Sequence, residues 1–178
     1  KTAYEIKECD WSSDVCSSDL YQMGRGLYEH DPVFRAEMDA LDRVPQALAG
    51  VSVLKAMYGS RGKGEPFDAL GLTHPAIFMV EFALAQAVRA RGVQPACVLG
   101  SSLGLYAALA VAGALGAEEA LAMVVRQAQV VERHGPRGGM VGVLHAPRLF
   151  EDSEFLRARA SLSGRNFGSH FVLSAPQA

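Results

Sequence analysis

The sequence predicts an α/β domain, and three features of the chain lead to this prediction. Segments with helical periodicity fill most of the middle of the chain. One short apolar run, Ala96–Leu99, follows Pro95 and has the composition of a buried parallel strand. That run ends at a G-x-S-x-G pentapeptide, Gly100–Gly104, which leads into an alanine-rich helical segment. The resulting order of helix, strand, helix, helix and strand is typical of a sheet covered by helices.

The N-terminal elements are helical. Tyr21–Glu29 and Val33–Val44 have helical composition and meet at Asp31-Pro32, where Asp can cap the second helix and Pro can occupy its first turn. The segment Gly59–Gly64 is rich in glycine and carries two basic residues. It has neither a preceding strand nor the Lys-Ser/Thr ending of a phosphate-binding loop, so we expect a flexible surface loop.

A long helix is predicted next, capped by Thr73-His74-Pro75 and ending at Arg91. Its apolar faces would come from Ile77, Val80, Phe82, Leu84 and Val88.

After the pentapeptide, Leu105–Ala112 and Glu118–Arg133 are predicted as helices, the first stopped by Gly113. The glycines of the segment 136–139 should end the second helix, and Met140–Leu144 is a strand candidate.

The first twenty residues stand apart from the rest. Lys1–Leu20 resembles a read-through translation of a sequencing-library adapter, and it has neither the apolar nor the basic region of a signal peptide. We therefore expect residues 1–20 to be non-native. Two of the three cysteines, Cys9 and Cys16, lie in this segment, which leaves Cys97 without a disulfide partner. A reducing, cytoplasmic location is the corresponding expectation.

Composition excludes little but argues against two classes of partner. The chain is 49% hydrophobic and 20% charged with a net charge of -2, which gives no electrostatic reason to expect nucleic-acid binding. Apolar runs fall short of the roughly 20 residues that a bilayer requires, so we expect no membrane partner.

The pentapeptide predicts a nucleophile elbow at Ser102. A sharp strand-to-helix turn exposes the serine hydroxyl, and flanking glycines remove the Cβ atoms that would clash. The following helix offers free N–H groups and its dipole to an oxyanion, so the N–H of Leu103 is the expected donor. A serine in an ordinary strand-to-helix turn is the alternative.

Several motifs in order decide between these alternatives, because together they resemble the malonyl-CoA:acyl-carrier-protein transacylase and polyketide synthase acyltransferase family. The motifs are Tyr21–Gly24, Thr73–Phe78, Gly100–Gly104 with Tyr106, Ala112–Leu115 and Gly138–Met140. The similarity covers everything after residue 20 and is nearest to the stand-alone enzymes of polyketide synthases.

The resemblance implies a fold and a division of the chain. Residues 21–140 would form the large acyltransferase subdomain, an α/β-hydrolase-like core with a parallel sheet. Residues 141–178 would begin a small ferredoxin-like subdomain. We expect a fragment truncated at both ends.

The resemblance also implies a reaction. Ser102 would take an acyl group from a thioester and pass it to the phosphopantetheine thiol of an acyl carrier protein, or to water in hydrolysing members. The partners would be acyl carrier protein and acyl-CoA, with no metal and no other cofactor.

Two departures from the family pattern concern the substrate. Ser101 stands where the family usually has His. Malonyl-specific members carry an Arg twenty-five residues after the serine, and here that position is Gln127, with Arg126 beside it. In the predicted helix Glu118–Arg133, the periodicity of apolar residues places Gln127 on the apolar face and Arg126 on the solvent-exposed face. A neutral amide cannot compensate a carboxylate, and losing one partner of a buried pair costs about 3–5 kcal/mol, so we expect uncharged acyl groups to be preferred. A Gln127 amide satisfied by backbone is the alternative.

The third departure is the general base. The family's catalytic His would lie beyond Ala178, and Asn166 with His170 resembles the loop that precedes it. We expect the histidines within the chain to be structural or exposed. His74 replaces a pocket-lining Gln of the family and is the best second candidate for substrate binding.

Four alternative functions can be compared with this one. An uncharged-acyl enzyme could be a proofreading acyl hydrolase, and a malonyl-CoA:acyl-carrier-protein transacylase is the alternative within the family. An α/β-hydrolase esterase would need an HGGG-type loop and a downstream Asp and His, which the sequence lacks. A carrier-protein docking domain without activity would not need the elbow.

Overall fold

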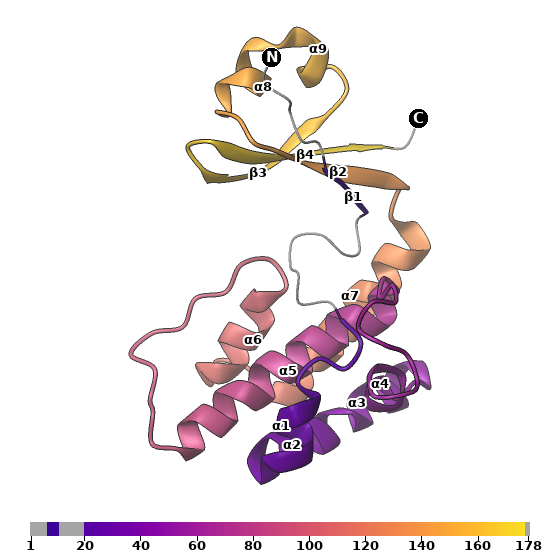
Figure 1. Ribbon diagram of the computed structural model, residues 1–178, viewed down its shortest axis with the longest axis vertical. Helices are drawn as coiled ribbons and strands as arrows, with labels where there is room; N and C mark the ends of the chain where they lie inside the picture. The colour runs from indigo at the N-terminus through magenta and orange to yellow at the C-terminus, as the bar shows by residue number, and fades with distance from the viewer. Residues whose placement is uncertain (1–6, 11–19, 177–178) are drawn as a thin grey trace. The chain divides into compact units, whose positions relative to one another are not determined.

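The computed structural model describes residues 7–10 and 20–176, and its contacts divide them into two compact units. Residues 20–134 form a helical unit, and residues 135–176 form a second unit with the strand β1 (Lys7–Asp10) (Figure 1). The division lies between His134 and Gly135, whereas the boundary predicted from sequence, after residue 140, falls within strand β2 (Gly138–Val143).

The helical unit is built around one long helix, α5 (Leu70–Ala90), which packs against α2, α4, α6 and α7. The other helices are α1 (Arg25–His30), α2 (Pro32–Leu41), α3 (Arg43–Ala49), α4 (Val53–Met57), α6 (Gly104–Val111) and α7 (Ala117–His134). The largest side chains of the core, all fully buried, are Phe34, Met38, Val53, Met57, Phe78, Met79, Leu121 and Val124. The mixed helix and sheet content agrees with the predicted α/β class.

Among the residues that the structure describes, α5 is the one helix that is long and apolar enough to cross a membrane. Length and composition alone are weak evidence, because the core helix of a soluble protein passes the same test. Eight residues of α5 are buried inside the helical unit.

The predicted cap at Asp31 is confirmed. Its Oδ1 accepts hydrogen bonds from the backbone N–H groups of Val33 (3.0 Å) and Phe34 (2.9 Å), while Oδ2 accepts one from the Arg91 guanidinium at 2.5 Å. Asp31 is only 4% exposed. One buried carboxylate therefore caps the start of α2 and ties it to the residue that ends α5.

The start of α5 was predicted wrongly. The helix begins at Leu70 rather than at Thr73-His74-Pro75, and Pro75 lies inside it. The N–H of Gly71, in the first turn of α5, has no partner within its own helix and donates to the Glu132 carboxylate of α7 at 2.8 Å. A side chain far along the sequence thus supplies the cap, and local sequence signals cannot show a cap of that kind.

The strand predicted at Ala96–Leu99 is also wrong. This segment has no strand structure, and the Leu99 side chain is 98% exposed. A strand needs a neighbour to share its backbone hydrogen bonds. The described strands all belong to the other unit, where they pair antiparallel with one another, so no parallel sheet forms within residues 7–10 and 20–176.

The second unit is a four-stranded sheet with two short helices, and the strand order is β1-β2-β4-β3. After β2 come α8 (Arg148–Asp152), α9 (Glu154–Arg157), β3 (Ser161–Phe167) and β4 (His170–Pro176). In the register of the sheet, Gly139 lies opposite Ala175 and Val143 opposite Phe171. The predicted strand after α7 is confirmed, but it starts at Gly138, so the glycines expected to break α7 lie in β2 instead.

Candidate active site

The turn before α6 holds Ser102 in a backbone conformation that side chains rarely adopt. Its φ is 52°, and among the described non-glycine residues only Gln22 shares a positive φ. A left-handed conformation at such a residue costs about 1–3 kcal/mol, so it persists only where the surroundings impose it. The left-handed turn and the helix that follows agree with part of the elbow predicted for Ser102, whereas the strand expected before the turn is absent. The role of Ser102 as nucleophile stays a prediction.

The two glycines of the pentapeptide have different roles. A Cβ on Gly100 would lie 2.3 Å from the carbonyl oxygen of Gly104 and 2.6 Å from the Cα of Leu105. Nothing lies within 4 Å of a Cβ on Gly104. Gly100 is therefore the residue that lets the chain fold back tightly beneath Ser102.

The backbone of the turn leaves a donor where an oxyanion could form. Gly104 N–H donates to Ser101 O at 3.0 Å, and Leu105 N–H donates to Ser102 O at 3.1 Å. Within the described chain, the N–H of Leu103 donates no hydrogen bond. The side chains of Ser101 and Ser102 are exposed. The turn thus offers a free N–H beside an exposed hydroxyl at the start of α6.

A general base is not in contact with Ser102 in the part of the chain that the structure describes. His30 Nδ1 lies 2.9 Å from Gly26 O, and His170 Nδ1 lies 2.8 Å from the Asn166 amide nitrogen. His145 Nδ1 lies 3.2 Å from Ala146 O. These contacts agree with the structural or exposed roles expected for these histidines. A serine without its base loses several orders of magnitude in rate.

His74 differs from these histidines, because it is half-buried on α5. Its Nδ1 is buried without a hydrogen-bond partner among the described residues. Burial lowers the pKa of His74, and the nearby Glu132 carboxylate opposes that shift. The imidazole is therefore neutral at physiological pH, with one polar atom unsatisfied. The substrate-binding role expected for His74 stays a prediction.

The orientation predicted for Gln127 is wrong. Gln127 is exposed, as is Arg126. The buried face of α7 consists instead of Ala120, Leu121, Val124, Val125 and Ala128. Periodicity was misleading because α7 has a second apolar stripe around Gln127, formed by Met123 (43% exposed) and Val130 (58% exposed). The substrate-binding role of Gln127 stays a prediction.

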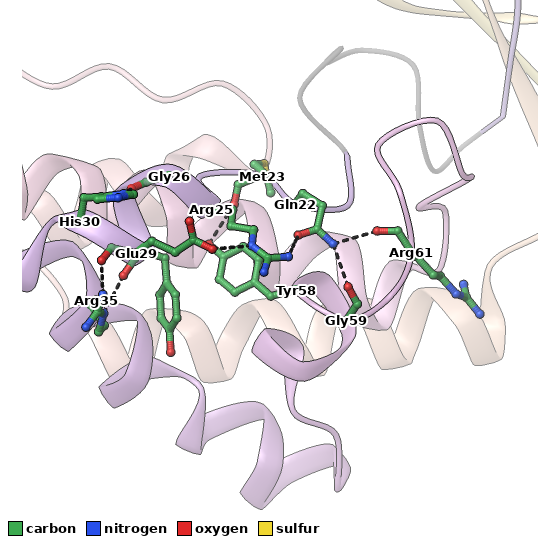
Figure 2. Close-up of polar contacts among 11 residues, drawn as sticks. Gln22, Met23, Arg25, Gly26, Glu29, His30, Arg35, Tyr58, Gly59 and Arg61 are labelled. Carbon is green, nitrogen blue, oxygen red and sulfur yellow. Dashed lines mark hydrogen bonds and ion pairs between the residues drawn. The ribbon is translucent and has the colours of Figure 1, made fainter.

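Sequence reasoning missed Gln22, which has a φ of 67°. Its amide nitrogen donates to Gly59 O (2.9 Å) and Arg61 O (2.8 Å), and its Oε1 accepts from the Arg25 guanidinium at 2.7 Å (Figure 2). The glycine-rich loop expected to be flexible is therefore exposed but tied to the turn at residues 20–24. Gln22 lies within the motif Tyr21–Gly24, but neither that motif nor any periodicity in the sequence predicts its contact with the loop.

Comparisons with known proteins agree with this geometry. A family profile described as acyl transferase domain matches residues 20–160. The polyketide biosynthesis acyltransferase homolog BaeD of Bacillus velezensis is 45% identical over 88% of this chain and 49% of its own length. The polyketide biosynthesis acyltransferase homolog PksD of Bacillus subtilis is 37% identical over 90% of this chain and 50% of its own length. The chain thus spans about half the length of these relatives.

Two solved structures show the same fold. The acyltransferase domain from module 8 of the salinomycin polyketide synthase gives a TM-score of 0.77 at 27% identity, over 93% of this chain and 38% of that one. A loading acyltransferase from the avermectin modular polyketide synthase gives 0.75 at 25% identity, over 96% of this chain and 52% of that one. The likeness spans both units of the chain.

Proposed function

The chain belongs to the acyl transferase domain family, and from this premise we propose that the full-length protein transfers acyl groups from thioesters through Ser102, in polyketide biosynthesis. The observation that carries the proposal is the left-handed backbone of Ser102 on a turn that only a glycine at position 100 permits. The polyketide biosynthesis roles in the names of BaeD and PksD support the setting.

The proposed reaction has two half-reactions. The Ser102 hydroxyl oxygen attacks the thioester carbonyl carbon while its proton passes to a basic side chain of the full-length protein. The tetrahedral oxyanion is stabilised by the Leu103 N–H and the dipole of α6. The carbon–sulfur bond then breaks, and the thiolate takes the proton. The acyl group remains as an ester on Ser102 until the thiol of a carrier protein attacks it in the same way. This chemistry needs no metal or redox cofactor.

We further propose that uncharged acyl groups are preferred over malonyl groups. Gln127 offers an amide where a carboxylate would need a guanidinium, and a charge-assisted bidentate pair contributes about 1.5–3 kcal/mol. The exposed side chains Met123 and Val130 flank Gln127 on α7 and would suit an aliphatic acyl chain. Ser101 and the neutral His74 would complete the substrate contacts. If water replaces the carrier thiol, the same acyl-enzyme yields a free acid, and the protein is an acyl hydrolase.

A malonyl-specific transacylase is the second candidate, and one observation favours it. Arg126 is exposed next to Gln127, so its guanidinium is free to turn toward a bound carboxylate. An inactive docking domain is disfavoured, because it would gain nothing from the strain at Ser102.

Intact-protein mass spectrometry of the full-length protein tests the preference. The protein is incubated with butyryl and malonyl thioesters, and acylation rates are compared for the wild type, Gln127→Arg and Arg126→Ala. We expect faster butyryl acylation in the wild type, a relative gain for malonyl of about 10- to 150-fold in Gln127→Arg, and no change in Arg126→Ala. Fast malonyl acylation that Arg126→Ala abolishes would instead establish the second candidate.

A further inference from the structure

The segment Gly59–Glu65, called the basic loop below, is held in one conformation although it lies on the surface. Besides the two bonds from the Gln22 amide, the Arg61 guanidinium donates to the Tyr21 hydroxyl at 2.6 Å. The Gly62 N–H donates to a carboxylate oxygen of Glu65 at 2.8 Å. Side chains from the turn at residues 20–24 and from the loop itself therefore fix a loop whose own residues are exposed.

The anchor of the basic loop is conformationally costly. Gln22 adopts a φ of 67°, which costs about 1–3 kcal/mol at a non-glycine residue. Its three side-chain hydrogen bonds contribute about 1 kcal/mol each and offset that strain. These bonds connect the turn at residues 20–24 to the loop and to the Arg25 guanidinium (Figure 2).

The basic loop presents two cations, Arg61 and Lys63, that form no ion pair with a carboxylate among the described residues. The Arg61 guanidinium lies 5.3 Å from the centre of the Tyr21 ring and contacts no acid. Lys63 has no partner in the described chain and lines an open cavity of about 480 Å³ together with Gln22, Arg25 and Glu29. Glu29 is already paired with Arg25 at 2.7 Å. The two cations Arg61 and Lys63 outnumber Glu65, the single acid of the basic loop, so the loop carries a small net positive charge on a backbone held by hydrogen bonds.

We propose that Arg61 and Lys63 of the basic loop form the docking surface for an acidic face of the acyl carrier protein; this rests on the function proposed above. Charge complementarity favours this occupant, because fixed cations on an exposed surface steer an anionic protein and set its orientation. A fixed loop also loses less conformational entropy on binding than a flexible one.

The test separates the two half-reactions in the full-length protein. In Arg61→Glu/Lys63→Glu, we expect loading of Ser102 from butyryl-CoA at the wild-type rate, and transfer to the carrier protein slower by about 10-fold at low salt. Raising the salt concentration should slow transfer in the wild type and leave the variant nearly unchanged. Gln22→Ala changes no charge and should slow transfer by about 3-fold, because it frees the loop.

A matched control carries the same change in charge elsewhere. Arg43 and Arg159 are exposed and form no ion pair among the described residues. Arg43→Glu/Arg159→Glu should transfer acyl groups at the wild-type rate. Equal slowing in both double variants would show a net-charge effect and overturn the proposal.

Other outcomes are equally decisive. Unchanged transfer in Arg61→Glu/Lys63→Glu would overturn the docking surface. Loss of loading from butyryl-CoA would show that the cations bind the phosphates of CoA instead. Binding of carrier protein without its phosphopantetheine arm to Ser102→Ala protein is a readout that needs no catalysis. If this binding depends on Arg61 and Lys63, while protein that retains Ser102 is not acylated by any thioester, the docking surface stands and the proposed function fails.

Discussion

Replacement of Gly100 by alanine should disable the elbow without touching the nucleophile. The added Cβ would meet three backbone atoms, the carbonyl oxygen of Gly104 at 2.3 Å, its carbonyl carbon at 2.5 Å and the Cα of Leu105 at 2.6 Å. Backbone atoms cannot rotate away as the end of a flexible side chain can. The turn that carries Ser102 has to move instead.

The size of the movement gives the size of the effect. The Gly104 oxygen must retreat by about 0.7 Å to reach the 3.0 Å that Cβ contacts respect. Because Gly104 begins α6 two residues after Ser102, the hydroxyl oxygen and the Leu103 N–H would shift by a similar amount. A misplacement of about 1 Å costs about 100-fold in rate, so we expect acylation to slow by about 10- to 100-fold.

The assay is the rate of acyl-enzyme formation in the full-length protein, followed by mass spectrometry under single-turnover conditions. Gly104→Ala is the matched control, because a Cβ there meets nothing within 4 Å. It should acylate at a rate close to that of the wild type. Circular dichroism of both variants checks that the helices are retained.

One result would refute this reasoning. If Gly100→Ala is acylated as fast as the wild type while keeping its helices, the close approach of residues 100 and 104 is not what positions Ser102. Equal losses in Gly100→Ala and Gly104→Ala would point to a general need for flexibility in the turn instead.

Three further predictions concern stability and use urea unfolding. Ser102→Gly should stabilise the protein by about 1 kcal/mol by relieving the positive φ, while abolishing acylation; lower stability would contradict the strain at Ser102. The Phe34 N–H and the Arg91 guanidinium hold the pKa of Asp31 below that of an ordinary carboxyl. The contribution of the ionised Asp31 to the free energy of unfolding is therefore present above the unfolded-state pKa of about 3.9, and it is lost as pH falls through the folded-state pKa. Asp31→Asn should therefore be less stable at pH 7, with the difference narrowing below about pH 4; a gap independent of pH would refute the ionic role. Glu132→Ala should lose about 1 kcal/mol because it uncaps α5, whereas Glu132→Gln should lose less; equal losses would exclude the cap.

The sequence predicted those elements whose formation depends on interactions between residues close together in the chain. The cap at Asp31, the helix after the pentapeptide and the long helix α7 depend on neighbours within a few residues, and all three were found. The tight turn at Ser102 was predictable for the same reason, because a sharp turn before a helix needs glycine in a known place.

Features that depend on distant partners could not be predicted this way. Helix α5 starts earlier than expected because Glu132, on another helix, caps it. Among the residues that the structure describes, no strand lies beside the Ala96–Leu99 segment to share its backbone hydrogen bonds. Gln127 was assigned to the wrong face because α7 has two apolar stripes and only one is buried. The Gln22 contacts join residues nearly forty positions apart, and no periodicity reveals them.

The most direct test of the account is to locate the acyl group. The full-length protein is incubated with a butyryl thioester, digested, and mapped by tandem mass spectrometry, with Ser102→Ala treated in parallel. The account predicts one added butyryl group on the peptide that contains Ser102 and none in the variant. A butyryl group on another residue, or equal labelling of Ser102→Ala, would contradict the assignment of Ser102 as the nucleophile.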